Sequence, residues 1–257
     1  MTRLAGLPVL TFHSFGESKA VHSADPSWFD ETLAMLAEAG FHCVDLDDWV
    51  ASGRPDEPLG YAITIDDGLR SILKIVDSLQ KHRATATVFL ATGRVGSNNA
   101  WPGQPSWVPV EPILFWNEIR SLAKVGLKFA AHGVTHARLD RCSASRIEAE
   151  LKGSRDAIED CLGTSCRLVA YPYGSANRFV KEFARKAFLG GFGTRLDFAD
   201  GDQDPLELAR VDTFYLRTDR LRAAVGSGHG RPALRWRSAL RGAKQTALTA
   251  LRPSRPY

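Results

Sequence analysis

The sequence of 257 residues has few cysteines and no long hydrophobic run. Its four cysteines, Cys43, Cys142, Cys161 and Cys166, include no CxxC pair, so the sequence supports neither a zinc ribbon nor a redox motif. No stretch approaches the roughly 18 apolar residues that a membrane-spanning helix needs. The opening MTRLAGLPVLTFHSF lacks the apolar core of a signal peptide. These absences predict a cytoplasmic protein with reduced thiols.

Acidic residues are also absent from the end of the chain. No Asp or Glu follows Asp219, so residues 220–257 carry nine Arg and Lys and a charge of +9, against −5 for the remainder. Residues 233–251 place an apolar face beside Arg and Lys, a pattern typical of a helix lying on an anionic membrane. A helix packed on the folded domain, or a solvated tail, explains the pattern equally well. We therefore expect a domain at 1–222 and a basic tail at 223–257, with peripheral contact to the inner face of a membrane as one role of the tail. No recognition motif accompanies the charge, so nucleic acid is not expected as a partner.

Short β-prone runs alternate with helical patterns along the domain. The expected strands are Val9–Phe12, Ala62–Ile65, Ala86–Leu90, Leu127–Ala131, Leu168–Tyr171, Gly191–Thr194 and Val211–Tyr215. The expected helices are Ser27–Ala39, Leu69–Lys81, Trp116–Lys124, Ala144–Leu162 and Arg178–Phe188. Repeated β-then-α order indicates a parallel sheet with helical crossovers, and this many strands in one domain favours a barrel. The stretch 93–112, rich in Gly, Pro and Asn, is expected to form a long loop.

Polar residues follow several of the expected strands. His13 comes after the first strand, Asp66 and Asp67 after the second, His132 after the fourth, and Tyr171-Pro172-Tyr173-Gly174 closes the fifth. In a βα barrel the chemistry gathers where the strands end. These residues are therefore the candidates for a common site.

The pair of adjacent acids needs an explanation, because neighbouring carboxylates repel each other. His132 and His136 lie four apart, and on a helical turn both imidazoles would share one face. Two imidazoles and the Asp67 carboxylate suit zinc or a similar divalent ion. Asp66 would then remain free to accept a proton from water, and Gly68 permits the tight turn that brings both acids to one mouth. Taken alone, the two histidines are better explained as surface residues, and the two acids are explained by a common Asp-Asp-Gly turn with a solvated surface.

The segments TIDDG, HGVTH and YPYG, in this order and spacing, resemble the motifs of polysaccharide deacetylases, a carbohydrate esterase family. The resemblance runs from about LPVLTFH to LARVDTFY. It implies an irregular (β/α)7 barrel and removal of acyl groups, usually acetyl from N-acetylated sugars, with a divalent metal. Zinc is the expected ion, with nickel or cobalt as alternatives.

The resemblance also implies roles for individual residues. Asp66 matches the general base, and Asp67, His132 and His136 match the metal ligands. Tyr173 matches the residue whose backbone N–H stabilises the oxyanion, within a turn that Pro172 and Gly174 would shape.

Three further positions depend on departures from the common pattern. Many members of the family have a late Leu-x-x-His that supplies the general acid, and this motif is missing here. We therefore assign that role to His13, as in a subgroup that deacetylates exopolysaccharides. The alternative is that His13 only packs at the mouth of the barrel. Arg210 resembles an arginine that braces the base. Asn177 would contact the substrate or hold its own loop in place. Trp101, Trp107 and Trp116 would stack on sugar rings of the substrate or pack within the folded protein.

The sequence thus predicts a metal-dependent deacetylase acting on an N-acetylated sugar, glycan or lipid-linked saccharide in exopolysaccharide or lipopolysaccharide biosynthesis. An O-acetyl esterase or a sugar deformylase would use the same residues. A non-catalytic glycan-binding barrel is a rival of another class, although a binding module would not need the spare carboxylate of Asp66.

Overall fold

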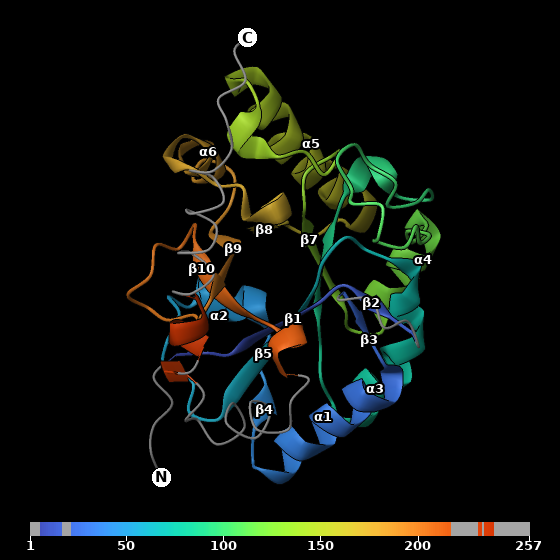
Figure 1. Cartoon of the computed structure of the whole chain (residues 1–257), viewed down its shortest axis with the longest axis vertical. Coiled ribbons are helices and arrows are strands. Elements are labelled where there is room, and N and C mark those ends of the chain that lie inside the picture. The colour runs from blue at the N-terminus through green and yellow to red at the C-terminus, as the bar shows by residue number, and fades with distance from the viewer. Residues whose placement is uncertain (1–5, 17–21, 217–230, 233, 239–257) are drawn as a thin grey trace.

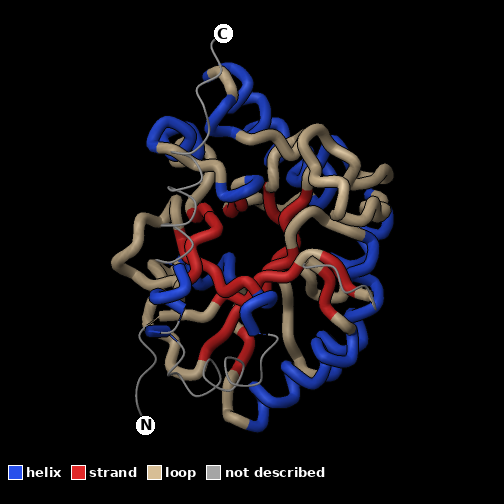
Figure 2. Tube along the Cα trace, in the orientation of Figure 1, coloured by secondary structure: helices blue, strands red, loops and turns tan. Residues whose placement is uncertain are grey.

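Seven parallel strands close into a barrel at the centre of the protein. The computed structural model describes residues 6–16, 22–216, 231–232 and 234–238. Around the barrel the strands follow the order β1, β10, β9, β8, β7, β6 and β5, and β5 pairs with β1 to close the ring. Figure 2 shows this ring of strands with helices and loops outside it. The predicted (β/α)7 barrel is confirmed.

The strands lie close to the predicted positions. They are β1 (Val9–Phe12), β5 (Gly60–Ile65), β6 (Thr87–Leu90), β7 (Lys128–Ala131), β8 (Leu168–Ala170), β9 (Gly190–Leu196) and β10 (Leu208–Asp212), with the short β2 (Ser14–Phe15), β3 (Ser23–Ala24) and β4 (His42–Cys43) beside them. The last barrel strand begins earlier than predicted, because a buried run of Leu208, Ala209 and Arg210 already pairs with β9. The predicted end of that strand instead forms the 3₁₀ turn η5 (Thr213–Leu216).

The helices form the outer layer of the barrel (Figure 1). They are α1 (Pro26–Glu38), α2 (Leu46–Ala51), α3 (Val76–Lys81), α4 (Trp116–Lys124), α5 (Ala144–Leu162) and α6 (Arg178–Ala184), with 3₁₀ turns η1 (Arg70–Ile75), η2 (Thr92–Arg94), η3 (Leu139–Arg141) and η4 (Pro172–Gly174). The helix expected at 69–81 is divided between η1 and α3. The short α2 was not predicted, although Asp45 caps it with bonds to the N–H groups of Asp47 and Asp48.

Local signals explain why the longer helices begin and end where they do. The Asp25 side chain accepts from the Ser27 N–H, and Pro26 occupies the first turn of α1, where its missing N–H costs nothing. In α5 the Ser143 hydroxyl caps the first turn, and Gly163 ends the helix in a left-handed conformation.

The structure describes only residues 231–232 and 234–238 of the basic tail. Arg231 and Arg235 pair with Asp197 at 2.9 Å each, and Leu234 is fully buried, so this part packs on the barrel. Most of the apolar face predicted over 233–251 lies outside the described residues. Among the helices that are described, none has the length and hydropathy to cross a bilayer.

Candidate functional site

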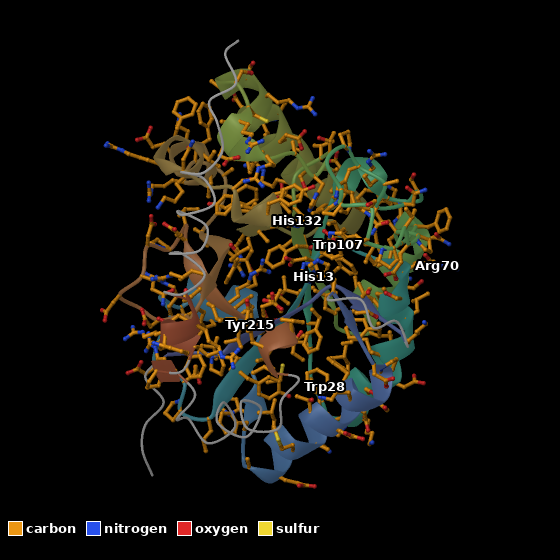
Figure 3. All side chains as sticks on the ribbon, in the orientation of Figure 1. His13, Trp28, Arg70, Trp107, His132 and Tyr215 are labelled. Carbon is orange, nitrogen blue, oxygen red and sulfur yellow. The ribbon has the colours of Figure 1, made fainter. Side chains whose placement is uncertain are left out.

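A cavity of about 340 Å³ lies at the carboxyl ends of the barrel strands. Its lining includes His13, Asp66, Asp67, His132, His136 and Arg210, which come from the ends of several different strands. Figure 3 shows His13, His132 and Trp107 close together near the middle of the molecule, whereas Arg70 and Trp28 lie towards its edge. The structure therefore brings most of the predicted site residues to one place.

Three of these side chains converge on a single point. The Nε2 atom of His132 lies 3.5 Å from Oδ1 of Asp67, and Nε2 of His136 lies 3.3 Å from the same oxygen. One ligand atom from each residue falls within 4.8 Å of the others. Asp67 is distant in sequence from the two histidines, so the barrel fold is what assembles the three residues.

Left-handed backbone conformations aim two of the three ligands, Asp67 and His136. Asp67 has φ 73° and Gly68 also has φ 73°, which turns the chain out of the strand direction immediately after Asp66. A Cβ on Gly68 would stand 2.5 Å from Cδ2 of Leu90, so any other residue would force this buried leucine to shift. His136 has φ 59° and lies in a loop, so the two imidazoles come together without the helical turn that their spacing would allow. Positive φ in residues other than glycine is strained and typical of functional sites.

Each histidine is held by different neighbours. Nδ1 of His132 lies 2.7 Å from the carbonyl oxygen of Ala170, a contact that places the proton on Nδ1 and leaves Nε2 as the ligand atom. The ring of His136 is stacked on Trp101, with centroids 3.9 Å apart, and meets the edge of Tyr173. Its Nδ1 is buried with no hydrogen-bond partner among the described residues.

A buried carboxylate on α5 fixes the loop that carries His136. Oε2 of Glu150 accepts from the N–H groups of Val134 and Thr135 at 2.7 and 2.8 Å, and Oε1 accepts from the Thr135 hydroxyl at 2.6 Å. Arg146 pairs with Oε1 from the first turn of the same helix. Sequence reasoning missed Glu150, although it interrupts a buried stripe of Ile147, Leu151 and Ile158, a pattern that marks an acid with an internal role.

The donor set fits a divalent ion. Bonds of about 2.0–2.2 Å in tetrahedral geometry put ligand atoms roughly 3.3–3.5 Å apart, which agrees with the two measured distances. Burial lowers the pKa of His136 and keeps it neutral, as a ligand must be. Burial opposes protonation of His132 too, but the Asp67 and Asp66 carboxylates outweigh it and raise its pKa. This excess of negative charge favours a cation at the site.

Asp66 lines the same cavity, but it pairs with an arginine, whereas Asp67 lies beside the two histidines. Its two oxygens accept from Nη1 and Nη2 of Arg210 at 2.7 and 2.8 Å, and both side chains are almost fully buried. Burial would raise the pKa of Asp66, but the Arg210 guanidinium overcomes this and holds that pKa below its usual value. Nε2 of His13 lies 3.9 Å from Oδ2 of Asp66. Asp66 is thus an ionised carboxylate at the mouth, next to a partly exposed imidazole.

The turn at 172–174 forms another wall of the cavity. Tyr173 has φ 60° and lines the cavity, and a Cβ on Gly174 would stand 2.4 Å from Oγ1 of Thr194, so the sequence of this turn is tightly restricted. Pro172 is buried, and its carbonyl accepts from the Ser175 hydroxyl at 2.6 Å. Asn177 lies outside the cavity lining, and its side chain caps α6 through the Val180 N–H. The contact that the structure gives Asn177 is therefore that of a helix cap.

The long loop after η2 supplies an aromatic wall. Trp107 is 60% exposed at the cavity and stacks on His22, which in turn meets the ring of His13. Trp101 is buried against His136, whereas Trp116 packs against the hydrophobic core. Of the three tryptophans, Trp107 therefore offers the open indole face, and His22 is a cavity residue that the sequence did not reveal.

Comparisons with known proteins agree with this geometry. The family model for polysaccharide deacetylase matches residues 54–189. A bifunctional xylanase/deacetylase of Pseudobutyrivibrio xylanivorans is 27% identical over 51% of this chain and 19% of its own length. The uncharacterised protein YlxY of Bacillus subtilis is 25% identical over 59% of this chain and 42% of its own length. The chain thus spans less than half of the length of either relative.

Solved structures are similar over most of the described barrel. The Streptococcus pyogenes deacetylase PplD in complex with acetate has a TM-score of 0.71 and 21% identity, covering 82% of this chain and 93% of its own. IcaB of Ammonifex degensii has a TM-score of 0.70 and 20% identity, covering 88% and 97%. At this level of identity the likeness establishes the fold.

Proposed function

Because the chain belongs to the polysaccharide deacetylase family, we propose that it uses a divalent cation to hydrolyse the acyl amide of an N-acetylated sugar or glycan. The observation that carries the proposal is the convergence of Asp67, His132 and His136 on one point, with the unligated carboxylate of Asp66 beside them.

In the proposed reaction, three residues bind the cation and a fourth accepts a proton. Asp67, His132 and His136 hold the cation, for which zinc is the best match to two imidazoles and one carboxylate. When bound, such an ion polarises a carbonyl oxygen and lowers the pKa of a coordinated water towards about 7. Asp66 accepts the proton of the attacking water, since its carboxylate is kept ionised by Arg210.

Two groups act on the other atoms of the reacting amide. His13, which lies beside Asp66 at the cavity mouth, gives a proton to the departing amine. The backbone N–H of Tyr173 hydrogen-bonds to the oxygen that gains negative charge. The open face of Trp107 stacks on a sugar ring, which holds the substrate over these groups.

The setting that suits this chemistry is the biosynthesis of an exopolysaccharide or lipopolysaccharide. The Streptococcus pyogenes deacetylase PplD holds acetate in its solved structure, which supports acetyl as the acyl group. Contact of the basic tail with a membrane would bring the enzyme to a lipid-linked substrate, and that part of the proposal depends on the sequence alone.

Acetate release from a panel of N-acetylated and O-acetylated oligosaccharides tests the proposal. We expect release from N-acetylated members, loss of release after chelation, and recovery when zinc is restored. Asp66→Asn and His13→Gln should each lower kcat by about 10²–10⁴. Asp56→Asn and His42→Gln, which change exposed residues away from the cavity, are the matched controls. Release that is unaffected by chelation contradicts the proposal, and release from O-acetylated members alone identifies an esterase.

A further inference from the structure

A second cavity, of about 480 Å³, adjoins the first one. His136 and Tyr173 line both cavities and so form the wall between them. The rest of the second lining comes from η2, the long loop, the loop after His136 and the start of α5; it includes Arg94, Gly103, Thr135, Arg138 and Arg146. Three arginines therefore surround a hollow next to the candidate catalytic centre.

These arginines keep donors for a ligand. Arg94 makes one long contact with a described residue, at 3.5 Å to the carbonyl oxygen of Ala100. Arg138 lies over the ring of Tyr173 at 5.3 Å and meets Asp140 at 3.6 Å, and its side chain remains 41% exposed. A guanidinium carries five N–H donors in a planar fork, so these contacts leave most of the donors of both residues free.

Arg146 has a different position in the cluster. It binds Oε1 of Glu150 and the Thr135 hydroxyl, so it is tied to the loop that carries His136, while half of its side chain stays exposed. Its charge adds to those of Arg94 and Arg138 at the rim, and it lies in the first turn of α5, where the helix dipole is also positive.

The two cavities have opposite charge. The first is lined by the carboxylates of Asp66, Asp67, Glu111 and Asp212, which repel an acidic sugar unless a cation intervenes. Among the described residues, those that line the second include no carboxylate. Complementary potentials of this kind set the register of a ligand and discriminate between charged and neutral ligands.

From this arrangement, and on the basis of the proposed function, we infer that Arg94, Arg138 and Arg146 bind an anionic group of the substrate. The group is a carboxylate or phosphate on the glycan unit next to the N-acetylated sugar, since guanidinium forks pair with both in bidentate fashion. Tyr173 divides the neutral, reacting unit from the charged one. The substrate class is therefore an acidic glycan.

Calorimetric binding of three tetrasaccharides to the purified, metal-loaded protein tests this inference. The probes are an N-acetylglucosamine tetramer, the same tetramer carrying one 6-phosphate, and a tetramer alternating N-acetylglucosamine with glucuronic acid. We expect at least one charged probe to bind about tenfold more tightly than the neutral one. The probe that gains more identifies phosphate or carboxylate as the natural group.

Two variants establish where the preference arises. In Arg94→Gln/Arg138→Gln the ratio of neutral to charged Kd should fall at least about threefold. Arg146 is left intact because it also holds Glu150, and it keeps one positive charge at the site. Arg141→Gln, in the turn η3 that follows Arg138 but outside the cavity lining, should keep the ratio. Equal binding of charged and neutral probes by the unchanged protein overturns the inference, and so does a preference that is undiminished in the double variant.

Acetate release measured on the same samples separates this inference from the proposed function. A preference for charged probes that depends on Arg94 and Arg138, without release from any probe, supports the anion site and contradicts hydrolysis. Release from all three probes at equal affinity supports hydrolysis and contradicts the anion site.

Discussion

Replacing Glu150 by glutamine tests how the fold holds the metal-binding loop. The carboxylate accepts three hydrogen bonds of 2.6 to 2.8 Å from Val134 and Thr135. A hydrogen bond to a charged group contributes about 1 kcal/mol more than a neutral one, so loss of the charge should lower the free energy of unfolding by about 3 kcal/mol. The loop carries His136, so zinc affinity should also fall, by about 10–100-fold.

The assay has two parts, denaturant unfolding of chelator-stripped protein and competition for zinc with a chelating dye. Glu148→Gln is the matched control, because Glu148 lies on the same helix but is exposed. We expect both quantities to change only in Glu150→Gln. If zinc affinity stays within about twofold of the unchanged protein, the reasoning that this carboxylate positions the loop is refuted.

Three other substitutions have outcomes that follow from the structure. Arg210→Met leaves the buried Asp66 carboxylate without its partner and should lower the free energy of unfolding by about 3–5 kcal/mol. Adding Asp66→Asn to this variant should recover part of the loss. Purely additive effects of the two substitutions would contradict a coupled pair. Gly68→Ala should lower the melting temperature and zinc content more than Gly103→Ala, because both have positive φ but only the first meets a leucine methyl at 2.5 Å; equal shifts would argue against the clash. Asp197→Asn should expose the segment that carries Arg231 and Arg235 to limited proteolysis. Burial opposes ionisation of Asp197, but Arg231 and Arg235 outweigh it and lower the pKa of the carboxyl group. In the unchanged protein these ion pairs therefore hold above about pH 4 and are lost as the pH falls through the lowered pKa. Digestion that does not depend on pH would contradict this.

The sequence predicted the barrel and the gathering of the site residues because both depend on patterns that are local in the chain. Apolar runs ending in His13, Asp66 or His132 are visible without any knowledge of the fold, and parallel strands must place those ends together. The family motifs then implied roles that residue spacing alone left open. They distinguish Asp66, as the general base, from Asp67, as a metal ligand.

What the sequence did not predict depends on backbone conformation and on contacts distant in the chain. The two histidines meet through a left-handed backbone conformation at His136, and their spacing does not distinguish this from a helical turn. The pairing of Asp66 with Arg210 spans 144 residues, and only the family resemblance pointed to it. The second cavity is lined by segments that only the folded barrel brings together, so no role for Arg94 and Arg138 could be inferred from the sequence.

The central claim is that Asp67, His132 and His136 bind one cation while Asp66 remains free beside it. Anomalous scattering at the zinc edge from crystals of the purified, zinc-loaded protein tests this claim most directly. We predict a single peak within about 2.0–2.2 Å of a ligand atom of each of the three residues, with both Asp66 oxygens still bound to Arg210. A peak elsewhere, or one coordinated by Asp66, would contradict the account.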